Sequence, residues 1–247
     1  MVGSSDSISS PNVVLNTIAA EAFKEAADIL EKAEDFDTAV HDMIKEQLAA
    51  HRRIIFNGNG YSDAWVEEAE KRGLPNIKSM VEAIPALTTE ASVRMFEEFN
   101  VFTKAELESR VEIEYEAYSK AINIEARTMI DMAGKQIIPA AVKYATMLAD
   151  SLSKVQTACP DADVSVQAEL LTETSAYLSD MKVALAALID ATEKCGTIEN
   201  NKEQANAYHD TVVPAMEALR APADKLEMMV DKELWPMPSY GDLIFEV

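Results

Sequence analysis

The chain has 247 residues, and its 43 aspartates and glutamates against 22 lysines and arginines give a formal net charge of −21. A charge of this sign repels phosphate backbones and anionic lipid headgroups, which argues against nucleic acid or a membrane surface as a partner. Apolar residues make up 48% of the chain, enough for a packed core, so intrinsic disorder is also excluded. The 37 alanines and only seven glycines favour helices over phosphate-binding loops and tight hairpins.

Targeting signals and cysteine motifs for metal binding are absent from the sequence. The first ten residues contain neither a basic region nor an apolar stretch, unlike a secretory signal. No run of residues approaches the roughly 18 apolar residues that a membrane span requires. Cys159 and Cys195 form no C-x-x-C or Cys/His framework, so both are expected to be reduced thiols. These features together predict a cytoplasmic protein.

Helical periodicity begins close to the N-terminus. Ser10 can cap the free N–H groups of a helix in which Pro11 takes the first position and sacrifices no hydrogen bond. This helix is expected to end near Ala33, where acidic residues interrupt the apolar pattern, and a second helix follows. The apolar faces of the two helices consist of Val14, Leu15, Ile18, Ala22, Ile29 and Leu30, and of Val40, Met43, Ile44, Leu48 and Ile55.

The sequence Asn57-Gly58-Asn59-Gly60 is the strongest turn signal in the chain. A third helix is expected to begin behind it at Ser62-Asp63 and to stop at Gly73, in the usual order of capping residues. Short helical pieces, with Pro85 between them, are expected from there to Asn100.

The second half of the chain predicts much longer helices. Thr103 and Glu106 have the spacing of a capping box, in which each side chain accepts a hydrogen bond from the backbone N–H of the other residue. The helix behind this box is expected to kink or change register at Pro139 and to end near Cys159-Pro160. Its apolar residues repeat at intervals of four, four and three, as in a coiled coil: Leu107, Val111, Tyr115, Tyr118, Ile122, Ala126 and Met129.

Two further long helices complete the prediction, one from about Asp163 to Gly196 and one from about Asn200 to Leu234, the latter bent at Pro214 and Pro222. Their short connections make consecutive helices antiparallel neighbours. We therefore predict an all-α fold, in which long antiparallel helices form a bundle, with shorter N-terminal helices and an extended C-terminal tail. The apolar stripes of these two helices are Leu171, Leu178, Met181, Leu185 and Leu188, and Tyr208, Val212, Leu219, Leu226 and Val230.

Groups that could carry chemistry are sparse. The three histidines, His41, His51 and His209, lack the Glu-x-x-His spacing of di-iron helical bundles, so no metal site is expected. Paired carboxylates are frequent at this composition, and a solvated helix face is favoured over acid–base catalysis for them. Examples of such carboxylates are Glu112, Glu114 and Glu116.

The glycine pair in the turn provides two positions of a dinucleotide-binding fingerprint. The third position is Asp63 and no βαβ pattern surrounds it, so a tight turn between helices is favoured over a ligand-contacting loop.

The C-terminal segment from Trp235 to Phe245 concentrates large apolar side chains at a terminus that would otherwise fray. Its two prolines cannot continue the preceding helix, so the segment is expected to lie extended on another surface. That surface is either the chain's own bundle or a neighbouring subunit or domain.

Three separated blocks of the sequence, in matching order, resemble the type III glutamine synthetases. They are residues 2–21, residues 53–76, which include the run RIIFNGNGYSD, and residues 235–245. The resemblance extends over essentially the whole chain. It implies the C-terminal helical region of an ATP-dependent glutamate–ammonia ligase that serves nitrogen assimilation.

The same resemblance implies that the active site lies elsewhere. In this family the strands with the metal-binding glutamates, the ATP-contacting groups and the substrate-binding arginines lie upstream, so this chain is expected to begin after them. No residue of the chain matches a catalytic, cofactor-binding or metal-binding position, and the chain alone is expected to be inactive. ATP and Mg²⁺ are implied for the whole enzyme, with the upstream catalytic domain and the neighbouring subunits of a ring oligomer as partners.

The resemblance also divides the chain into three parts. Residues 1–35 are expected to be the closing helix of the catalytic domain, residues 36–102 a region of short helices with the Asn-Gly-Asn-Gly turn, and residues 103–247 the long-helix bundle and tail. The helical extension is expected to serve assembly or regulation. An isolated chain is expected to expose a surface around Val14, Ile18 and Phe23 that normally packs on the catalytic domain.

Two alternatives remain open at the level of sequence. One is a free-standing, acidic helical scaffold or interaction protein, and an in-frame catalytic domain encoded upstream would decide against it. The other is a carboxylate metal bundle, which would require metal in the purified protein.

Overall fold

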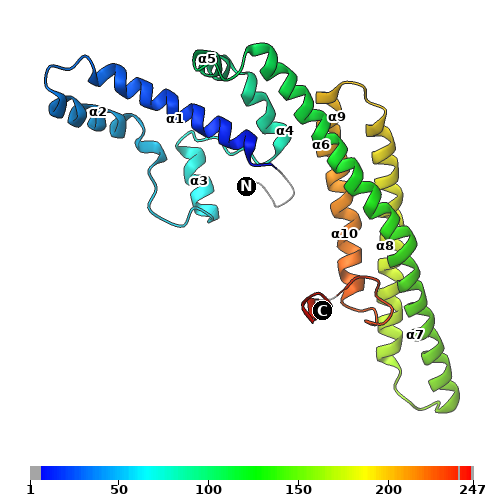
Figure 1. Cartoon of the computed structure of the whole chain (residues 1–247). Coiled ribbons are helices and arrows are strands. Elements are labelled where there is room, and N and C mark those ends of the chain that lie inside the picture. Colours follow the sequence, from blue (N-terminus) through cyan, green and yellow to red (C-terminus); the bar gives the residue numbers. More distant parts are fainter. Residues whose placement is uncertain (1–6, 239, 246–247) are drawn as a thin grey trace. The chain divides into compact units, whose positions relative to one another are not determined.

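A computed structural model describes residues 7–238 and 240–245 of the chain. The described residues form helices joined by turns, without any strand among them, which confirms the all-α prediction (Figure 1). The chain divides into two compact units, Met1–Ile113 and Glu114–Val247. The predicted boundaries at residues 35 and 102 are not tested by this division and stay a prediction.

The first unit contains the short helices predicted from the sequence. Ser62 caps α3 by accepting a hydrogen bond from the backbone N–H of Trp65 at 3.3 Å, and Gly73 ends it with a φ of +68°. The positions of both residues were therefore predicted correctly. The elements are α1 (Ser9–Leu30), α2 (Phe36–Ala50), a 3₁₀ turn (Arg52–Ile54), α3 (Asp63–Lys71), α4 (Met80–Ala83), a second 3₁₀ turn (Ile84–Thr88), α5 (Glu90–Glu98) and the first residues of α6 (Lys104–Met132).

The start of α1 differs from the prediction. The helix begins at Ser9, and its capping residue is Ile8, whose side chain makes no capping hydrogen bond. The Oγ of Ser7 instead accepts a hydrogen bond from the backbone N–H of Ser9 at 3.2 Å. Pro11 still lies in the first turn, where its missing N–H costs no intrahelical bond, so the proline signal was correct and the capping role of Ser10 was wrong.

A small apolar cluster joins three elements of the first unit. Phe96 of α5 and Leu107 of α6 are 1% exposed, and Val13 and Val14 of α1 pack against them. Thr103 and Glu106 form the predicted capping box, since Glu106 N–H donates to Thr103 Oγ1 at 3.3 Å and Thr103 N–H donates to Glu106 Oε2 at 2.8 Å. The box therefore fixes where α6 begins beside this cluster.

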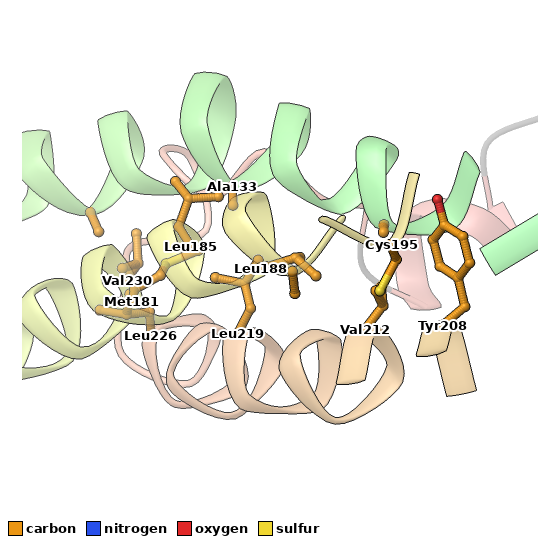
Figure 2. Packing of buried hydrophobic residues seen from close by; sticks show 13 residues of the cluster. Ala133, Met181, Leu185, Leu188, Cys195, Tyr208, Val212, Leu219, Leu226 and Val230 are labelled. Carbon is orange, nitrogen blue, oxygen red and sulfur yellow. The ribbon is translucent and has the colours of Figure 1, made fainter. Parts of the chain in front are cut away.

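The second unit is the predicted bundle of long helices. Its helix α8 packs against both α7 and α10, which makes consecutive long helices antiparallel neighbours, as Figure 1 shows. The predicted stripes form its core, with Met181 and Leu188 of α8 completely buried against Leu219 and Leu226 of α10 (Figure 2). The elements are the remainder of α6, α7 (Ile138–Ala158), α8 (Ser165–Gly196), α9 (Asn201–Ala207), α10 (Val213–Glu227) and α11 (Tyr240–Phe245).

Two π-helical turns interrupt these long helices, and each ends two residues before a proline. The first, Ala133–Ile137, precedes Pro139, and the second, Tyr208–Val212, precedes Pro214. A proline ring inside an α-helix would clash with the carbonyl four residues earlier, and the wider π turn moves that carbonyl away. Of the kink or register change predicted at Pro139, the structure shows a change of register, whereas Pro222 lies buried within a continuous α10.

The last helix of the bundle is shorter than predicted, because α10 ends at Glu227 rather than near Leu234. At this end the carbonyl oxygen of Leu226 accepts hydrogen bonds from the backbone N–H groups of Met229 at 3.1 Å and Val230 at 2.8 Å. Further on, the side chain of Asp231 accepts a local hydrogen bond from the backbone N–H of Glu233 at 2.8 Å. Residues 228–238 lie outside the helices, so the chain leaves the helix before Trp235, where the tail was expected to begin. The segment 240–245 then forms the short helix α11, where an extended conformation was expected.

Candidate functional site

The most prominent surface feature of the first unit is a set of exposed apolar side chains on α1 and α2, called here the α1–α2 surface. Phe23 is 77% exposed and Leu15 is 63% exposed, and no residue of α2 is buried. A helix of a soluble protein normally buries its apolar stripe, so this stripe lacks a cover within the described residues of its unit. The surface consists of Leu15, Ile18, Phe23 and Ile29 of α1 and Ile44 and Leu48 of α2.

The opposite side of α1 is held by α5. Lys24 Nζ lies 2.9 Å from Glu98 Oε1 and 3.1 Å from Asp28 Oδ2, and Arg94 lies 3.6 Å from Glu21. The hydrogen bond to Glu98, followed by that to Asp28, raises the pKa of Lys24. These pairs are partly exposed and contribute little stability, but they fix which side of α1 faces α5. The stripe that carries Leu15 and Ile18 is left free for another contact.

The Asn57–Gly60 turn has a defined geometry. Asn59 Oδ1 accepts a hydrogen bond from the backbone N–H of Tyr61 at 3.0 Å, and Ser62 Oγ donates to Asn59 O at 2.8 Å. A Cβ on Gly58 would lie 2.6 Å from the Phe56 ring, whereas one on Gly60 would meet nothing within 4 Å. The described residues contain no strand beside the turn, so a dinucleotide-binding βαβ unit is absent from that part of the chain. The interpretation as a turn between helices is favoured.

The aromatic residues on either side of this turn pack together. The rings of Phe56 and Trp65 stack with centroids 4.0 Å apart, and the Arg72 guanidinium lies 5.4 Å from the Trp65 ring centroid. Arg72 belongs with Arg52 and Arg53 to a group of cations that is not evident from the sequence pattern. The signal in the sequence that could have identified this group is the Arg52-Arg53 pair in an otherwise acidic chain.

The three histidines do not converge with other metal ligands in the described part of the chain. His41 Nδ1 lies 3.5 Å from Asp42 and His209 Nδ1 lies 2.7 Å from Asp210, while His51 ends α2. No group of three or more His, Cys, Asp or Glu side chains that could hold a metal ion occurs among residues 7–238 and 240–245. The expectation that the chain holds no catalytic, cofactor-binding or metal-binding residue stays a prediction.

Glu116 of the carboxylate group pairs with Lys120 at 2.6 Å on an exposed face of α6, as expected for a solvated face. Both cysteines are free thiols in the structure, with Cys159 exposed and Cys195 buried. Burial raises the pKa of the Cys195 thiol, which makes it less reactive than an exposed thiol at neutral pH.

The first residues of the tail dock on the chain's own bundle, one of the two surfaces considered for it. Leu234 and Trp235 pack against the main core, and the Trp235 indole N–H donates to Glu227 at 3.1 Å. Together with residues of α6, α8 and α10, Trp235 lines an open pocket of about 280 Å³. Lys232 pairs with Asp242 at 3.0 Å and ties α11 to the turn before it. The apolar side chains of α11 are exposed, namely Leu243, Ile244 and Phe245.

No helix within residues 7–238 and 240–245 combines the length and the apolar character needed to cross a membrane.

Residues 39–156 match the family described as the glutamine synthetase C-terminal domain. A glutamine synthetase of Bacteroides fragilis is 34% identical over 251 residues, which cover 98% of this chain and 34% of that protein. A type-3 glutamine synthetase of Dictyostelium discoideum is 33% identical, with 99% of this chain and 34% of that protein covered. A glutamine synthetase of Butyrivibrio fibrisolvens is 35% identical over 84% of this chain and 30% of its own length. The chain thus spans about a third of the length of these relatives.

Proposed function

Because this chain belongs to the type III glutamine synthetase family and carries its C-terminal domain, we propose that it works as one part of an ATP-dependent glutamate–ammonia ligase. The observation that carries the proposal is the extent of the similarity, which covers 98% and 99% of the chain in two relatives. Because the chain spans only about a third of those relatives, the ligase reaction is assigned to the complete enzyme.

ATP and Mg²⁺, which the family implies, are assigned to the remainder of the enzyme. The described residues of this chain offer no cluster of carboxylates and imidazoles that would fit a divalent cation. The sites at which ATP, glutamate and ammonia bind therefore lie outside this chain in the proposal, which derives no catalytic step from its residues.

The role proposed for the chain itself is assembly. The α1–α2 surface presents apolar side chains that water solvates poorly, and its charged opposite side is already held by α5. We propose that this surface packs on the catalytic part of the same polypeptide, and that the bundle contacts neighbouring subunits of a ring oligomer. Placement in the cytoplasm belongs to the same proposal and agrees with the lack of a membrane-spanning helix in the described residues.

An activity assay tests whether the active site lies outside this chain. The isolated chain is expected to form no γ-glutamyl hydroxamate from glutamate, hydroxylamine, ATP and Mg²⁺, whereas the complete enzyme that contains it does so. Clear turnover by the isolated chain would overturn the assignment of the active site to the remainder of the enzyme.

A pair of variants in the complete enzyme tests the assembly role. Replacing Ile18 and Phe23 by Asp places two charges on the α1–α2 surface and is expected to lower both ring assembly and activity. Val66→Asp is the matched control, because Val66 is 41% exposed on α3 and belongs neither to that surface nor to the bundle. Normal assembly of the Ile18→Asp/Phe23→Asp enzyme would argue against the proposed contact.

A further inference from the structure

Three arginines of the first unit line one open groove. Arg52 and Arg53 come from the 3₁₀ turn after α2, and Arg72 comes from the end of α3. Together with Ile55 they surround a volume of about 570 Å³. In a chain with a net charge of −21, a groove lined by three cations and no carboxylate differs from its surroundings.

Arg72 is the fixed member of the group. Its Nε donates to Glu68 Oε1 at 2.7 Å, and its Nη1 donates to the carbonyl oxygen of Ile55 at 3.0 Å and to that of Arg53 at 3.4 Å. These bonds join the end of α3 to the turn that carries Arg52 and Arg53. Arg72 is therefore a positioning residue, which holds the other two arginines at the groove.

Arg52 and Arg53 themselves differ from the other arginines. Both are exposed, and neither forms an ion pair with a carboxylate in the described part of the chain. Two guanidinium groups that line one groove without a counter-charge repel each other, and a bound anion would relieve this repulsion. Each of the other five arginines has a side-chain partner: Arg72 with Glu68, Arg94 with Glu21, Arg110 with the Phe102 ring, Arg127 with Asn123, and Arg220 with Asp224.

We propose that Arg52 and Arg53 bind a small anion with two adjacent charged groups, the chemistry shared by a diphosphate and a dicarboxylic acid. Guanidinium groups bind phosphate and carboxylate oxygens through paired hydrogen bonds, which suits both kinds of ligand. The acidic remainder of the chain disfavours a long polyanion such as a nucleic acid. The site uses contacts within the first unit alone, so it does not depend on the proposed role in a ligase.

Isothermal titration calorimetry on the full chain at low ionic strength tests the site, with pyrophosphate and succinate as separate probes. We expect saturable binding of at least one probe, and the comparison of the two shows whether phosphate or carboxylate is preferred. Arg52→Gln combined with Arg53→Gln is expected to weaken this binding by about tenfold or more, the loss of roughly 1.4 kcal/mol. Binding is also expected to weaken as salt screens these exposed charges.

Two controls separate a built site from general attraction of anions. Lys32→Gln with Lys45→Gln removes two exposed positive charges from the same unit and is expected to leave the affinity unchanged. Arg52→Lys with Arg53→Lys keeps the charge, loses the paired hydrogen bonds and is expected to bind with intermediate affinity. Circular dichroism confirms that each variant is folded.

Fluorescence locates the bound anion. In a Trp235→Phe chain Trp65 is the remaining tryptophan, and it lies under Arg72 beside the groove, so its emission is expected to change on binding. Absence of saturable binding for both probes would overturn the proposal. Undiminished binding by the Arg52→Gln/Arg53→Gln chain, or an equal loss in the lysine control, would overturn it as well.

Discussion

In the unit Glu114–Val247 the apolar stripes of α8 and α10 are buried, with Leu188 and Leu226 at 0% exposure, whereas in the unit Met1–Ile113 much of the apolar surface of α1 and α2 faces solvent. The periodicity of the two regions is similar, so periodicity alone does not cause this difference. Helices of the bundle are long and joined by short turns, so each helix covers the stripe of its neighbour. The short helices α3, α4 and α5 leave the outer stripe of α1 uncovered.

The largest expected effect lies in the core of the bundle. Leu188→Ala leaves a cavity between α8 and α10 and is expected to lower the free energy of unfolding by about 2–5 kcal/mol. Urea denaturation followed by circular dichroism measures the change. Val183→Ala on the exposed side of the same helix is the control, with an expected change below about 0.5 kcal/mol. Equal losses in the two variants would contradict the difference in burial between these positions.

The capping box at the start of α6 is expected to have the next largest effect. Thr103→Ala removes the side-chain acceptor for the Glu106 N–H and is expected to cost about 1 kcal/mol in urea denaturation. Thr128→Ala is the control, because the hydroxyl of Thr128 only donates to the Ile124 carbonyl within the same helix. A larger loss for Thr128→Ala would contradict the role of the cap.

The same box predicts a dependence on pH. Hydrogen bonds from the backbone and then the side chain of Thr103 lower the pKa of Glu106 below its ordinary value of 4.5. The stabilisation is therefore fully present above pH 4.5 and is lost as the pH falls through the lower folded-state pKa. Wild type and Glu106→Gln are expected to differ in the midpoint of urea denaturation at pH 7 and to converge in acid. A constant difference down to pH 2 would count against this linkage.

Substitutions in the turn between α2 and α3 are expected to lower stability less than substitutions in the core of the bundle. A Cβ at position 58 meets the tip of the Phe56 ring, which can rotate away, so Gly58→Ala is expected to cost about 0.5–1.5 kcal/mol through loss of the Phe56–Trp65 stacking. Gly60→Ala meets no atom within 4 Å and is expected to be near neutral. Near-ultraviolet circular dichroism of the Trp235→Phe chain, in which Trp65 is the remaining tryptophan, reports the stacking. An unchanged spectrum for Gly58→Ala would show that the ring does not move.

The smallest effect on stability is expected on the α1–α2 surface. Ile18→Ser with Phe23→Ser removes side chains that are 49% and 77% exposed, so the free energy of unfolding is expected to change by less than about 1 kcal/mol. Binding of an apolar dye and self-association in light scattering are both expected to fall. A loss of stability similar to that of Leu188→Ala would mean that the two units bury their apolar residues alike.

The bundle could be predicted from sequence because local signals agree there with tertiary packing. Leu185, Leu188 and Leu219 lie where the repeat placed them, since in an antiparallel bundle the nearest apolar stripe is the adjacent helix. On α1 the apolar periodicity predicted an apolar stripe, but it does not indicate which part of the protein covers that stripe. Leu15 and Ile18 are consequently exposed, whereas Val13 and Val14 face α5.

Other features depend on contacts that a linear pattern does not contain. Arg72 bonds to carbonyl oxygens 17 and 19 residues earlier in the chain, so the arginine groove could not be inferred from spacing. The sequence around the end of α10 at Glu227 contains no proline or glycine, and α11 is tied to the preceding turn by Lys232. The prolines predicted where the long helices are interrupted. That each interruption is a π turn follows from the helix faces before and after it, which are both buried in the core.

The π turn before Pro139 keeps two stretches of helix in phase. In the main core Ala126 and Ala133 are seven positions apart, whereas Ala133 and Ala141 are eight apart, and Ala140 beside Ala141 is buried as well. The one longer interval spans the wider turn, so the extra residue acts as an insertion that leaves the downstream side chains on the core side. A relative with an uninterrupted α-helix here is therefore expected to be one residue shorter between the equivalents of Ala133 and Ala141, with every other core interval conserved in length.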